Sequence, residues 1–317
     1  IANADEPFHA VHRKLVLPQL NARKVVAMEG EVRSWARAGV LQLLASGGGD
    51  CVGDLANAIP VKVMARLMGL PVGDVTQLLQ WAFSGGDIRA GTATLERMIA
   101  LGLSTGEMRA YLARHFDSVF HSIGDREPQS VMAELANGVR EGVISKDEAI
   151  AISIVLVGAA GESTSSLVGS AIRILAENTE LQRQLRERYV EEVVRLESPF
   201  KGHYRAVLKE TRLGGVCIPD NARVFLLWAA ANRDPEVFAE PNQLDIARYN
   251  THEHLGFGHG IHFCIGARLA RMETRIILEE LLQHTRSFEL DSSFPVRHVP
   301  SIFVRRLGEL HLRLNPG

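Results

Sequence analysis

The stretch that most constrains the fold runs from Ser145 to about Glu177, because its pattern predicts one long helix in the protein interior. Ser145 and Glu148 form a capping-box pattern, in which each side chain satisfies a free backbone amide at the start of a helix. The first half is apolar on nearly every face, through residues such as Ile150 and Ile154. A helix of this kind crosses a core rather than lying on a surface. We therefore expect a mainly helical protein built around it.

The remaining helices and strands are predicted by the spacing of apolar residues. Three- and four-residue spacing predicts helices at 22–44, 60–68, 75–83, 95–120, 181–195 and 267–284. Strand-like pieces are short and gather in the C-terminal half, at 203–208, 216–218, 223–227, 302–305 and 310–314. Together they predict a mainly α fold with a small β portion, organised as one domain over residues 1–317.

The bulk composition argues against several classes of protein. A net charge of -2 at pH 7 gives no basic surface for nucleic acid or an anionic membrane. No uninterrupted apolar run reaches the roughly 18 residues of a membrane-spanning helix, and the start shows no signal peptide. Cys51, Cys217 and Cys264 are odd in number and far apart, which argues against a disulfide framework. We expect a cytoplasmic protein without nucleic-acid or membrane partners.

Cys264 lies in a glycine-rich loop directly before a predicted helix. A thiolate at a helix N-terminus is stabilised by free amides and by the positive end of the helix dipole. Gly258, Gly260 and Gly266 allow the backbone to come close to a flat object, against which Phe257 would pack. Iron bound by a cysteine thiolate needs this construction, with backbone hydrogen bonds to the sulfur.

Two other interpretations of this loop stay open from the residues alone. An isolated cysteine at a helix start is more often simply a buried side chain. A zinc site on His259, His262 and Cys264 is the second alternative, although this spacing resembles no common zinc site and no cysteine pair is nearby.

The same loop carries a resemblance to a known family. Phe257 is followed after two residues by Gly260, after three more by Cys264 and after one more by Gly266. This run resembles the haem-binding signature of cytochromes P450, and the following Leu-Ala-Arg is similar to soluble bacterial, actinobacterial-like members. The resemblance implies the cytochrome P450 fold, haem b (iron protoporphyrin IX) as cofactor and Cys264 as the iron ligand. It also places Phe257, Gly258 and Gly266 at the cofactor.

Four further residues gain meaning from this resemblance. His9 and Arg13 are one helical turn apart, Arg205 lies in a predicted strand, and His262 precedes the cysteine by two residues. Each of them alone is best interpreted as a solvated surface residue. The resemblance implies that all four contact the haem propionates.

Glu192 and Arg195 lie on one helix face at i and i+3. By itself this is a surface ion pair worth about 0.2–0.5 kcal/mol. With Arg248, the two resemble the family's Glu-Arg-Arg triad, which implies a buried structural network. The rigid fork of arginine suits such bidentate pairing.

The long central helix contains Ala159-Ala160-Gly161-Glu162-Ser163-Thr164, which resembles the family's oxygen-activation motif. An acid beside an alcohol inside an apolar helix is costly unless it is functional or well paired. The alternative is a helix kink, in which Ser163 or Thr164 bonds a carbonyl one turn earlier, and both interpretations can hold together. The resemblance implies that Glu162, with either hydroxyl, delivers protons. Ala160 replaces the usual glycine, and Ser163 stands where threonine is typical.

The resemblance implies a haem-thiolate monooxygenase that inserts one oxygen atom from O2 into an apolar organic substrate. A ferredoxin and an NAD(P)H reductase would supply the electrons, with Arg268, Arg271 and Arg275 either attracting the ferredoxin or pairing internally. The substrate is expected against Ala159, Ala160, Phe200 and His203. The alternatives are a haem-dependent peroxygenase and a non-catalytic haem-binding protein, and the acid-alcohol pair argues against both.

The resemblance covers about residues 7 to 314, nearly the whole chain. In the family, however, a further part of the fold precedes the helix that would carry His9. Members of the family also have a loop before the helix that would carry Glu192. This sequence lacks it, because Leu185 to Tyr189 runs directly into that helix. We therefore expect the natural protein to be longer than this sequence.

Overall fold

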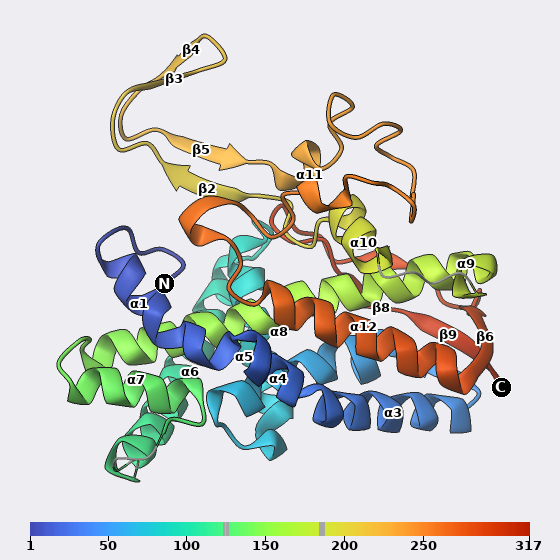
Figure 1. Ribbon diagram of the computed structural model, residues 1–317, viewed down its shortest axis with the longest axis horizontal. Coiled ribbons are helices and arrows are strands. Elements are labelled where there is room, and N and C mark those ends of the chain that lie inside the picture. The colour runs from blue at the N-terminus through green and yellow to red at the C-terminus, as the bar shows by residue number, and fades with distance from the viewer. Residues whose placement is uncertain (123, 125–126, 184–187) are drawn as a thin grey trace.

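The computed structural model describes residues 1–122, 124, 127–183 and 188–317 (Figure 1). The helices in this part of the chain are α1 (Phe8–Val16), α2 (Ala22–Ala27), α3 (Glu29–Ala45), α4 (Ala58–Met68), α5 (Val75–Arg89), α6 (Leu95–Ser122), α7 (Val131–Arg140), α8 (Lys146–Glu177), α9 (Thr179–Arg183), α10 (Tyr189–Glu197), α11 (Trp228–Ala231) and α12 (Ala267–His284). The strands are β1 (Gly48–Asp50), β2 (His203–Ala206), β3 (Thr211–Leu213), β4 (Val216–Ile218), β5 (Arg223–Leu226), β6 (Thr285–Leu290), β7 (Arg297–His298), β8 (Leu307–Glu309) and β9 (His311–Pro316).

Helix α8 crosses the middle of the molecule, with helices packed along most of its length (Figure 1). The predicted capping box is confirmed, because Ser145 Oγ accepts a hydrogen bond from the Glu148 amide at 3.2 Å and the Glu148 carboxylate accepts one from the Ser145 amide at 2.8 Å. By length and composition α8 is apolar enough to span a membrane. However, 61% of its most apolar window is buried inside the protein, as in the core helix of a globular domain.

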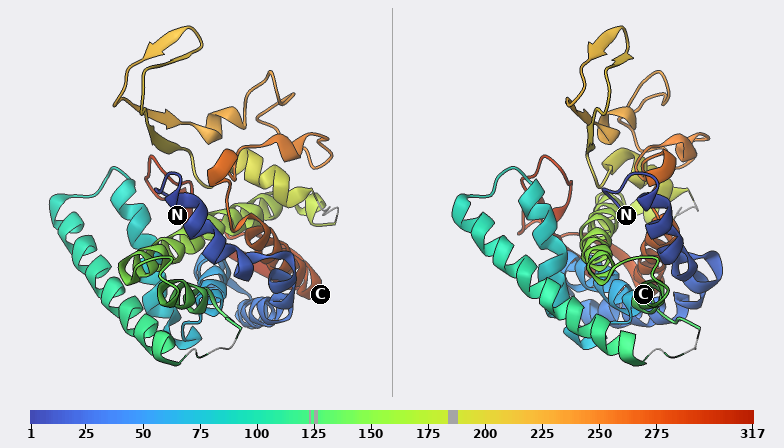
Figure 2. Two further views of the ribbon diagram at one scale, coloured as in Figure 1. Left: turned by 60° about the vertical axis from the view of Figure 1, so that its left-hand side comes forward. Right: turned by 90° about the vertical axis from the view of Figure 1, so that its left-hand side faces the viewer.

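The strands form small antiparallel sheets at two sides of the helical body. Strands β1, β9 and β6 make one sheet in the order β1-β9-β6, beside α3 and α12. Gly48 in β1 has φ +144°, and a Cβ there would overlap the carbonyl of Leu312 in β9, so only glycine fits this close approach. The pairs β2–β5 and β3–β4 form an arm that projects beyond the helices in all views (Figures 1 and 2).

Most of the predicted elements are confirmed, and α12 has the predicted bounds. The predicted helix 22–44 is wrong as one element, because α2 ends at Ala27 and α3 begins at Glu29, with a turn at Met28 between them. Helix α5 continues past the predicted end at Phe83 to Arg89, through glycine and polar residues that carry no apolar spacing.

Two further predictions differ from the structure. The described parts of the helix predicted at 181–195 belong to two helices, α9 and α10. The prediction that the family's loop is missing before Tyr189 falls on residues 184–187, which lie outside the described residues. The strand predicted at 302–305 is wrong, because only an isolated bridge joins Val304 to Phe200. Phe303 and Val304 are apolar because they are buried, at 7% and 1% exposure, and not because they lie in a strand.

Candidate functional site

The loop that carries Cys264 folds back on itself before α12 begins. The Cys264 amide donates to the Phe257 carbonyl at 2.9 Å, and the Phe263 amide donates to the Gly260 carbonyl at 3.0 Å. This reversal requires left-handed backbone at Gly258 (φ +71°) and Gly260 (φ +75°), which glycine adopts without strain. The loop therefore ends with Cys264 at the N-terminus of the helix, as the sequence predicts.

The electrostatic surroundings of Cys264 are mixed. Burial of the sulfur raises the pKa of the Cys264 thiol, while a hydrogen bond from the Gly266 amide and the guanidinium groups of Arg271 and Arg13 lower it. The protein thus supplies part of the stabilisation that a thiolate needs. A metal cation bound to the sulfur would supply the rest, because coordination deprotonates a thiol outright.

The zinc alternative is wrong for the described part of the chain. There, no group of three histidine, cysteine or carboxylate side chains is arranged to hold a metal ion. His262 instead packs its ring edge-to-face against His9, with ring centroids 4.4 Å apart.

Helix α1 places His9 and Arg13 beside the cysteine loop. Arg13 donates a hydrogen bond to the Phe263 carbonyl at 2.9 Å. His9 is 2% exposed and its Nδ1 lies 3.3 Å from Glu6, but its buried Nε2 has no hydrogen-bond partner in the described chain. Buried polar atoms nearly always have partners, so this nitrogen indicates a hydrogen-bonding group on a bound molecule.

Two other predicted propionate contacts lie near this group. Burial, His9 and Arg205 lower the pKa of His262, so Arg205 is close enough to act on it. Arg205 is exposed on β2 and donates to the Tyr204 carbonyl at 2.9 Å. The structure therefore gathers His9, Arg13 and His262 at the cysteine loop and leaves Arg205 exposed nearby.

Two uncovered apolar surfaces accompany these polar groups. One is a stripe at four-residue spacing along the otherwise buried α8, formed by the exposed Ala151 and Ala159 and the partly exposed Val155, with the Ser163 hydroxyl group at its end. The other lies on the cysteine loop, where Ile261 and Phe263 are 53% and 42% exposed. A flat apolar group with acidic edges would cover such surfaces and satisfy His9, so the residues present fit a haem.

Glu162 is 2% exposed inside α8, and its Oε1 accepts a hydrogen bond from Arg306 Nε at 3.0 Å. Burial raises the pKa of Glu162, while Arg306 and Arg89 lower it. The ion pair with Arg306 was not predicted, because Arg306 is 144 residues away in the sequence. The only signal was that a buried acid needs a partner.

The two candidate hydroxyl groups differ in their surroundings. Ser163 Oγ donates to the Ala159 carbonyl at 2.9 Å, which is the back-bonding alternative considered for this helix. Ser163 is half-buried on the uncovered stripe, whereas Thr164 is 7% exposed and faces the protein interior.

Glu192, Arg195 and Arg248 come together in one buried network. Arg195 Nε and Nη2 donate to the Glu192 carboxylate at 2.8 and 2.7 Å, and Arg248 Nε donates to it at 3.2 Å. The side chains of Glu192 and Arg195 are fully buried, and that of Arg248 is 5% exposed. A solvated surface pair is therefore the wrong interpretation of Glu192 and Arg195.

An aromatic cluster surrounds the predicted substrate residues Phe200 and His203. Their rings are 5.2 Å apart, and His203 Nδ1 accepts a hydrogen bond from Trp228 at 2.8 Å. Burial, together with Arg205 and Arg89, lowers the pKa of His203 to about 4, so its ring is neutral near pH 7. Phe303 packs on both Phe200 and His203 and was not predicted as a site residue. On α8, Ala159 is exposed and Ala160 is partly buried.

The comparisons with known proteins agree on one family. The profile of the cytochrome P450 family matches residues 187–301. Cytochrome P450 144 of Mycobacterium tuberculosis is 37% identical over 318 residues, which cover 98% of this chain and 72% of that protein. The chain belongs to the cytochrome P450 family. Cytochrome P450-terp of Pseudomonas sp is 32% identical over 96% of this P450 and 73% of its own length.

Solved P450 structures confirm the predicted fold. A complex of cytochrome P450 CREJ with (4-ethylphenyl) dihydrogen phosphate aligns with a TM-score of 0.91 and 28% identity, covering 98% of this chain and 79% of that one. P450BioI bound to an acyl carrier protein ligated to hexadec-9Z-enoic acid aligns with a TM-score of 0.90 and 26% identity, covering 98% and 81%. The protein is therefore a P450 monooxygenase of bacterial type, an oxidoreductase with a haem-iron cofactor.

Proposed function

We propose that this P450, as one domain over residues 1–317, binds haem b through Cys264 and oxidises an apolar organic substrate with O2 in the cytoplasm. The observation that carries the proposal is the folded loop that presents the Cys264 sulfur to the Gly266 amide, beside the unpartnered Nε2 of His9. The bound haem supplies O2 binding and the transfer of one oxygen atom.

The residues around the cofactor hold and orient it. Phe257, Gly258 and Gly266 would line the side of the loop that holds the haem, where glycine lets the backbone come close to the cofactor. His9, Arg13, His262 and Arg205 would hold the propionates through charge-assisted hydrogen bonds. The network of Glu192, Arg195 and Arg248 fixes the backbone that leads to this loop, since Arg195 also donates to the carbonyls of Asn232 and Pro241 at 2.8 Å.

Glu162 delivers protons through a neighbouring hydroxyl group. The position of Ser163 on the uncovered stripe with Ala159 supports it over Thr164, which faces the interior. The hydroxyl of Ser163 donates to the Ala159 carbonyl, so its oxygen is directed to accept a proton from another donor.

The substrate lies against Ala159, Ala160, Phe200 and His203. A neutral histidine among aromatic rings and small apolar side chains suits an apolar molecule. The ligands of P450BioI and CREJ, a carrier protein ligated to hexadec-9Z-enoic acid and (4-ethylphenyl) dihydrogen phosphate, each contain an apolar hydrocarbon part. A substrate of that general shape is consistent with the apolar residues here.

A ferredoxin with an NAD(P)H reductase supplies the electrons. A hollow of about 630 Å³ lies beside the cysteine loop, and its lining includes Arg13, Lys14 and Ile261. Of the three α12 arginines considered for this role, Arg271 bonds Glu191 at 2.9 Å and Arg275 bonds Glu279 at 2.8 Å. Internal pairing thus accounts for these two arginines. Because Arg13 is assigned to the propionates, Lys14 in the hollow beside α1 is the basic group that remains for an acidic donor.

The absorption spectrum of the reduced, carbon monoxide-bound protein tests this proposal. An intact thiolate ligand gives a Soret band far to the red of the band of histidine-ligated haem. We expect C264S to lose this band, while C51S and C217S keep it as matched controls. A C264S protein with an unchanged band would refute the assignment. Turnover with O2, reductant and ferredoxin, compared with turnover on peroxide alone, separates the monooxygenase from a peroxygenase.

A further inference from the structure

Arg89, the last residue of α5, carries a guanidinium group that has no acidic partner. In the part of the chain that the structure describes, it forms no hydrogen bond and no ion pair. Neighbouring atoms shield part of the side chain, which lowers the pKa of Arg89, while the more distant charge of Glu162 raises it. The residue is nevertheless exposed, so a bound molecule can reach this cation.

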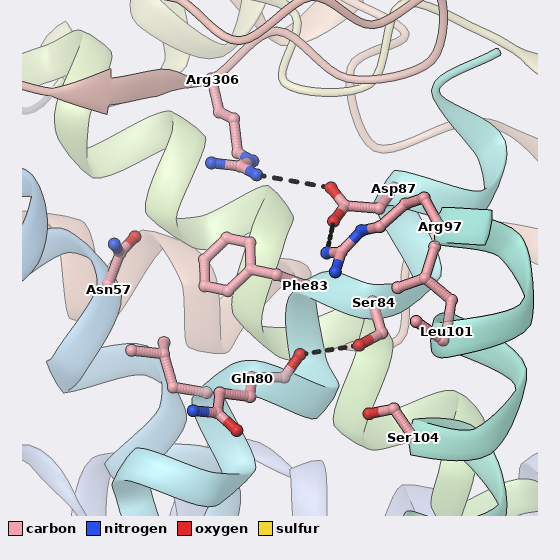
Figure 3. Close-up of a pocket in the computed structure, with 11 residues that line it drawn as sticks. Asn57, Gln80, Phe83, Ser84, Asp87, Arg97, Leu101, Ser104 and Arg306 are labelled. Carbon is pink, nitrogen blue, oxygen red and sulfur yellow. Dashed lines mark hydrogen bonds and ion pairs between the residues drawn. The ribbon is translucent and has the colours of Figure 1, made fainter. Parts of the chain in front are cut away.

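The acids around this end of α5 already have partners of their own. Asp87 accepts a hydrogen bond from Arg97 Nη2 at 2.6 Å, and Arg306 Nη2 lies 3.9 Å from the same carboxylate (Figure 3). Glu162 accepts a hydrogen bond from Arg306 Nε at 3.0 Å. The charge of Arg89 is therefore not compensated by either of these two acids at contact distance.

Three contacts hold the guanidinium group of Arg89 in place without using its N–H donors. Its Cζ lies 4.7 Å from the centre of the Phe303 ring, which is a cation-π distance. The Ile302 amide donates to the Ala90 carbonyl at 3.1 Å, so the backbones beside the two side chains are joined. A Cβ at Gly85 would lie 3.3 Å from Arg89 Nη2, so the group also rests against α5. A charge that is held in this way is preorganised to bind an anion.

The ring beneath Arg89 belongs to the aromatic cluster of the proposed substrate region. The Phe303 ring centre is 4.9 Å from that of Phe200 and 5.3 Å from that of His203. The charged groups that lower the pKa of His203 are Arg205 and Arg89, and both are cations. An apolar molecule on these rings thus has one end next to positive charge.

We propose that Arg89 binds a carboxylate at one end of the substrate, while the hydrocarbon body of the same molecule lies against Phe200, His203 and Phe303. The planar fork of one guanidinium group matches a carboxylate with two parallel hydrogen bonds, and its single charge compensates the single charge of the acid. The inference rests on the proposed substrate region. It adds the chemical class of the substrate, a carboxylic acid with an apolar body, and the residue that selects it.

The first experiment compares two probes that differ only in charge, dodecanoic acid and its methyl ester. Isothermal titration calorimetry of the holoenzyme near neutral pH measures the Kd of each. A hydrogen bond between charged groups changes affinity about 10- to 100-fold, so R89Q should raise the Kd of the acid by this factor and change that of the ester less than about twofold. R89K keeps the charge but lacks the planar fork, so it should recover part of the lost affinity for the acid.

R97Q is the matched control, because it removes a positive charge from the same part of the molecule, where Arg97 is paired with Asp87. We expect R97Q to bind the acid as wild type does. If R97Q weakens binding of the acid as much as R89Q, the effect is one of overall charge and the assignment to Arg89 is wrong.

The second experiment locates the oxidised carbon in decanoic, dodecanoic and tetradecanoic acids by mass spectrometry of the products. A carboxylate fixed at Arg89 sets the distance from that end of the molecule to the reacting centre. In wild type, the oxidised positions counted from the carboxyl carbon should therefore be the same in all three acids. In R89Q they should spread along the chain.

The outcomes separate this inference from the proposed function. Loss of the thiolate Soret band in the reduced, carbon monoxide-bound wild type, or absence of turnover with any apolar probe, would contradict the proposed function. A haem protein that oxidises the ester but fails to bind the acid would contradict the inference alone. Equal effects of R89Q on the Kd of acid and ester, or no recovery in R89K, would contradict it as well.

Discussion

Replacement of Glu192 by alanine should be among the most damaging single changes outside the cofactor site. The Glu192 carboxylate accepts hydrogen bonds from Arg195, from Arg248 and from the Asp245 amide at 3.0 Å. Without it, two guanidinium groups with side chains 0% and 5% exposed lose their anion and cannot reach water. Such an unpaired buried charge costs about 3–5 kcal/mol, against a total stability of about 5–15 kcal/mol for a typical protein.

The expected change in melting temperature follows from this free-energy cost and from the length of the chain. An unfolding entropy of about 2.1 cal/mol/K per residue gives about 0.7 kcal/mol/K for 317 residues, so the midpoint should fall by about 4–7 °C. Scanning calorimetry of the holoenzyme measures this shift. E29A is the matched control, because Glu29 pairs with Arg275 at 2.9 Å on the surface, where such a pair contributes about 0–1 kcal/mol. If E192A melts no lower than E29A, the buried network does not contribute as argued.

Three further predictions follow from single contacts. H9A should speed the loss of haem to an acceptor protein about 10- to 100-fold, because a hydrogen bond to a charged group contributes about 1.5–3 kcal/mol; an unchanged rate would contradict the propionate contact. Arg271 bonds Glu191 at 2.9 Å, and such hydrogen-bonding partners outweigh burial and hold the pKa of Glu191 at about 2. The stability that this ionised carboxylate contributes to the folded state is present above the usual carboxyl pKa and is lost as pH falls through 2. E191Q should therefore lose less stability than wild type during acid denaturation. G48A should destabilise by about 1–3 kcal/mol in urea unfolding through its strained φ, while G73A, at an open position with ordinary φ, should be neutral.

The sequence predicts elements well where the determining residues are neighbours. The capping box and apolar faces of α8 lie within the helix, and the residues of the cysteine loop are consecutive, so both were predicted correctly. Strand β1 was not predicted, because Gly48-Gly49-Asp50 has no apolar pattern and becomes a strand only by pairing with β9, more than 250 residues later. The break at Met28 likewise interrupts a stretch whose local spacing favours one helix.

In the candidate site too, contacts between neighbouring residues could be predicted and contacts between distant residues could not. Glu192 and Arg195 are one turn apart, and their pairing could be inferred from spacing alone. The partner of Glu162 could not, since Arg306 lies in another part of the fold and is one of many arginines in the sequence. What the sequence does show is that a carboxylate within an apolar helix needs a counter-charge, which leaves the identity of that charge to the tertiary structure.

The wrongly predicted strand at 302–305 explains why that counter-charge is available. A strand directs successive side chains to two opposite faces only. The irregular segment, held by hydrogen bonds from the Lys201 amide to the Phe303 carbonyl and from the Arg305 amide to the Pro199 carbonyl, directs them to three places. Phe303 packs in the aromatic cluster, Arg305 bonds Glu197 at 3.0 Å, and Arg306 bonds Glu162. One short segment thus contacts both the proposed substrate region, through Phe303, and the buried acid, through Arg306.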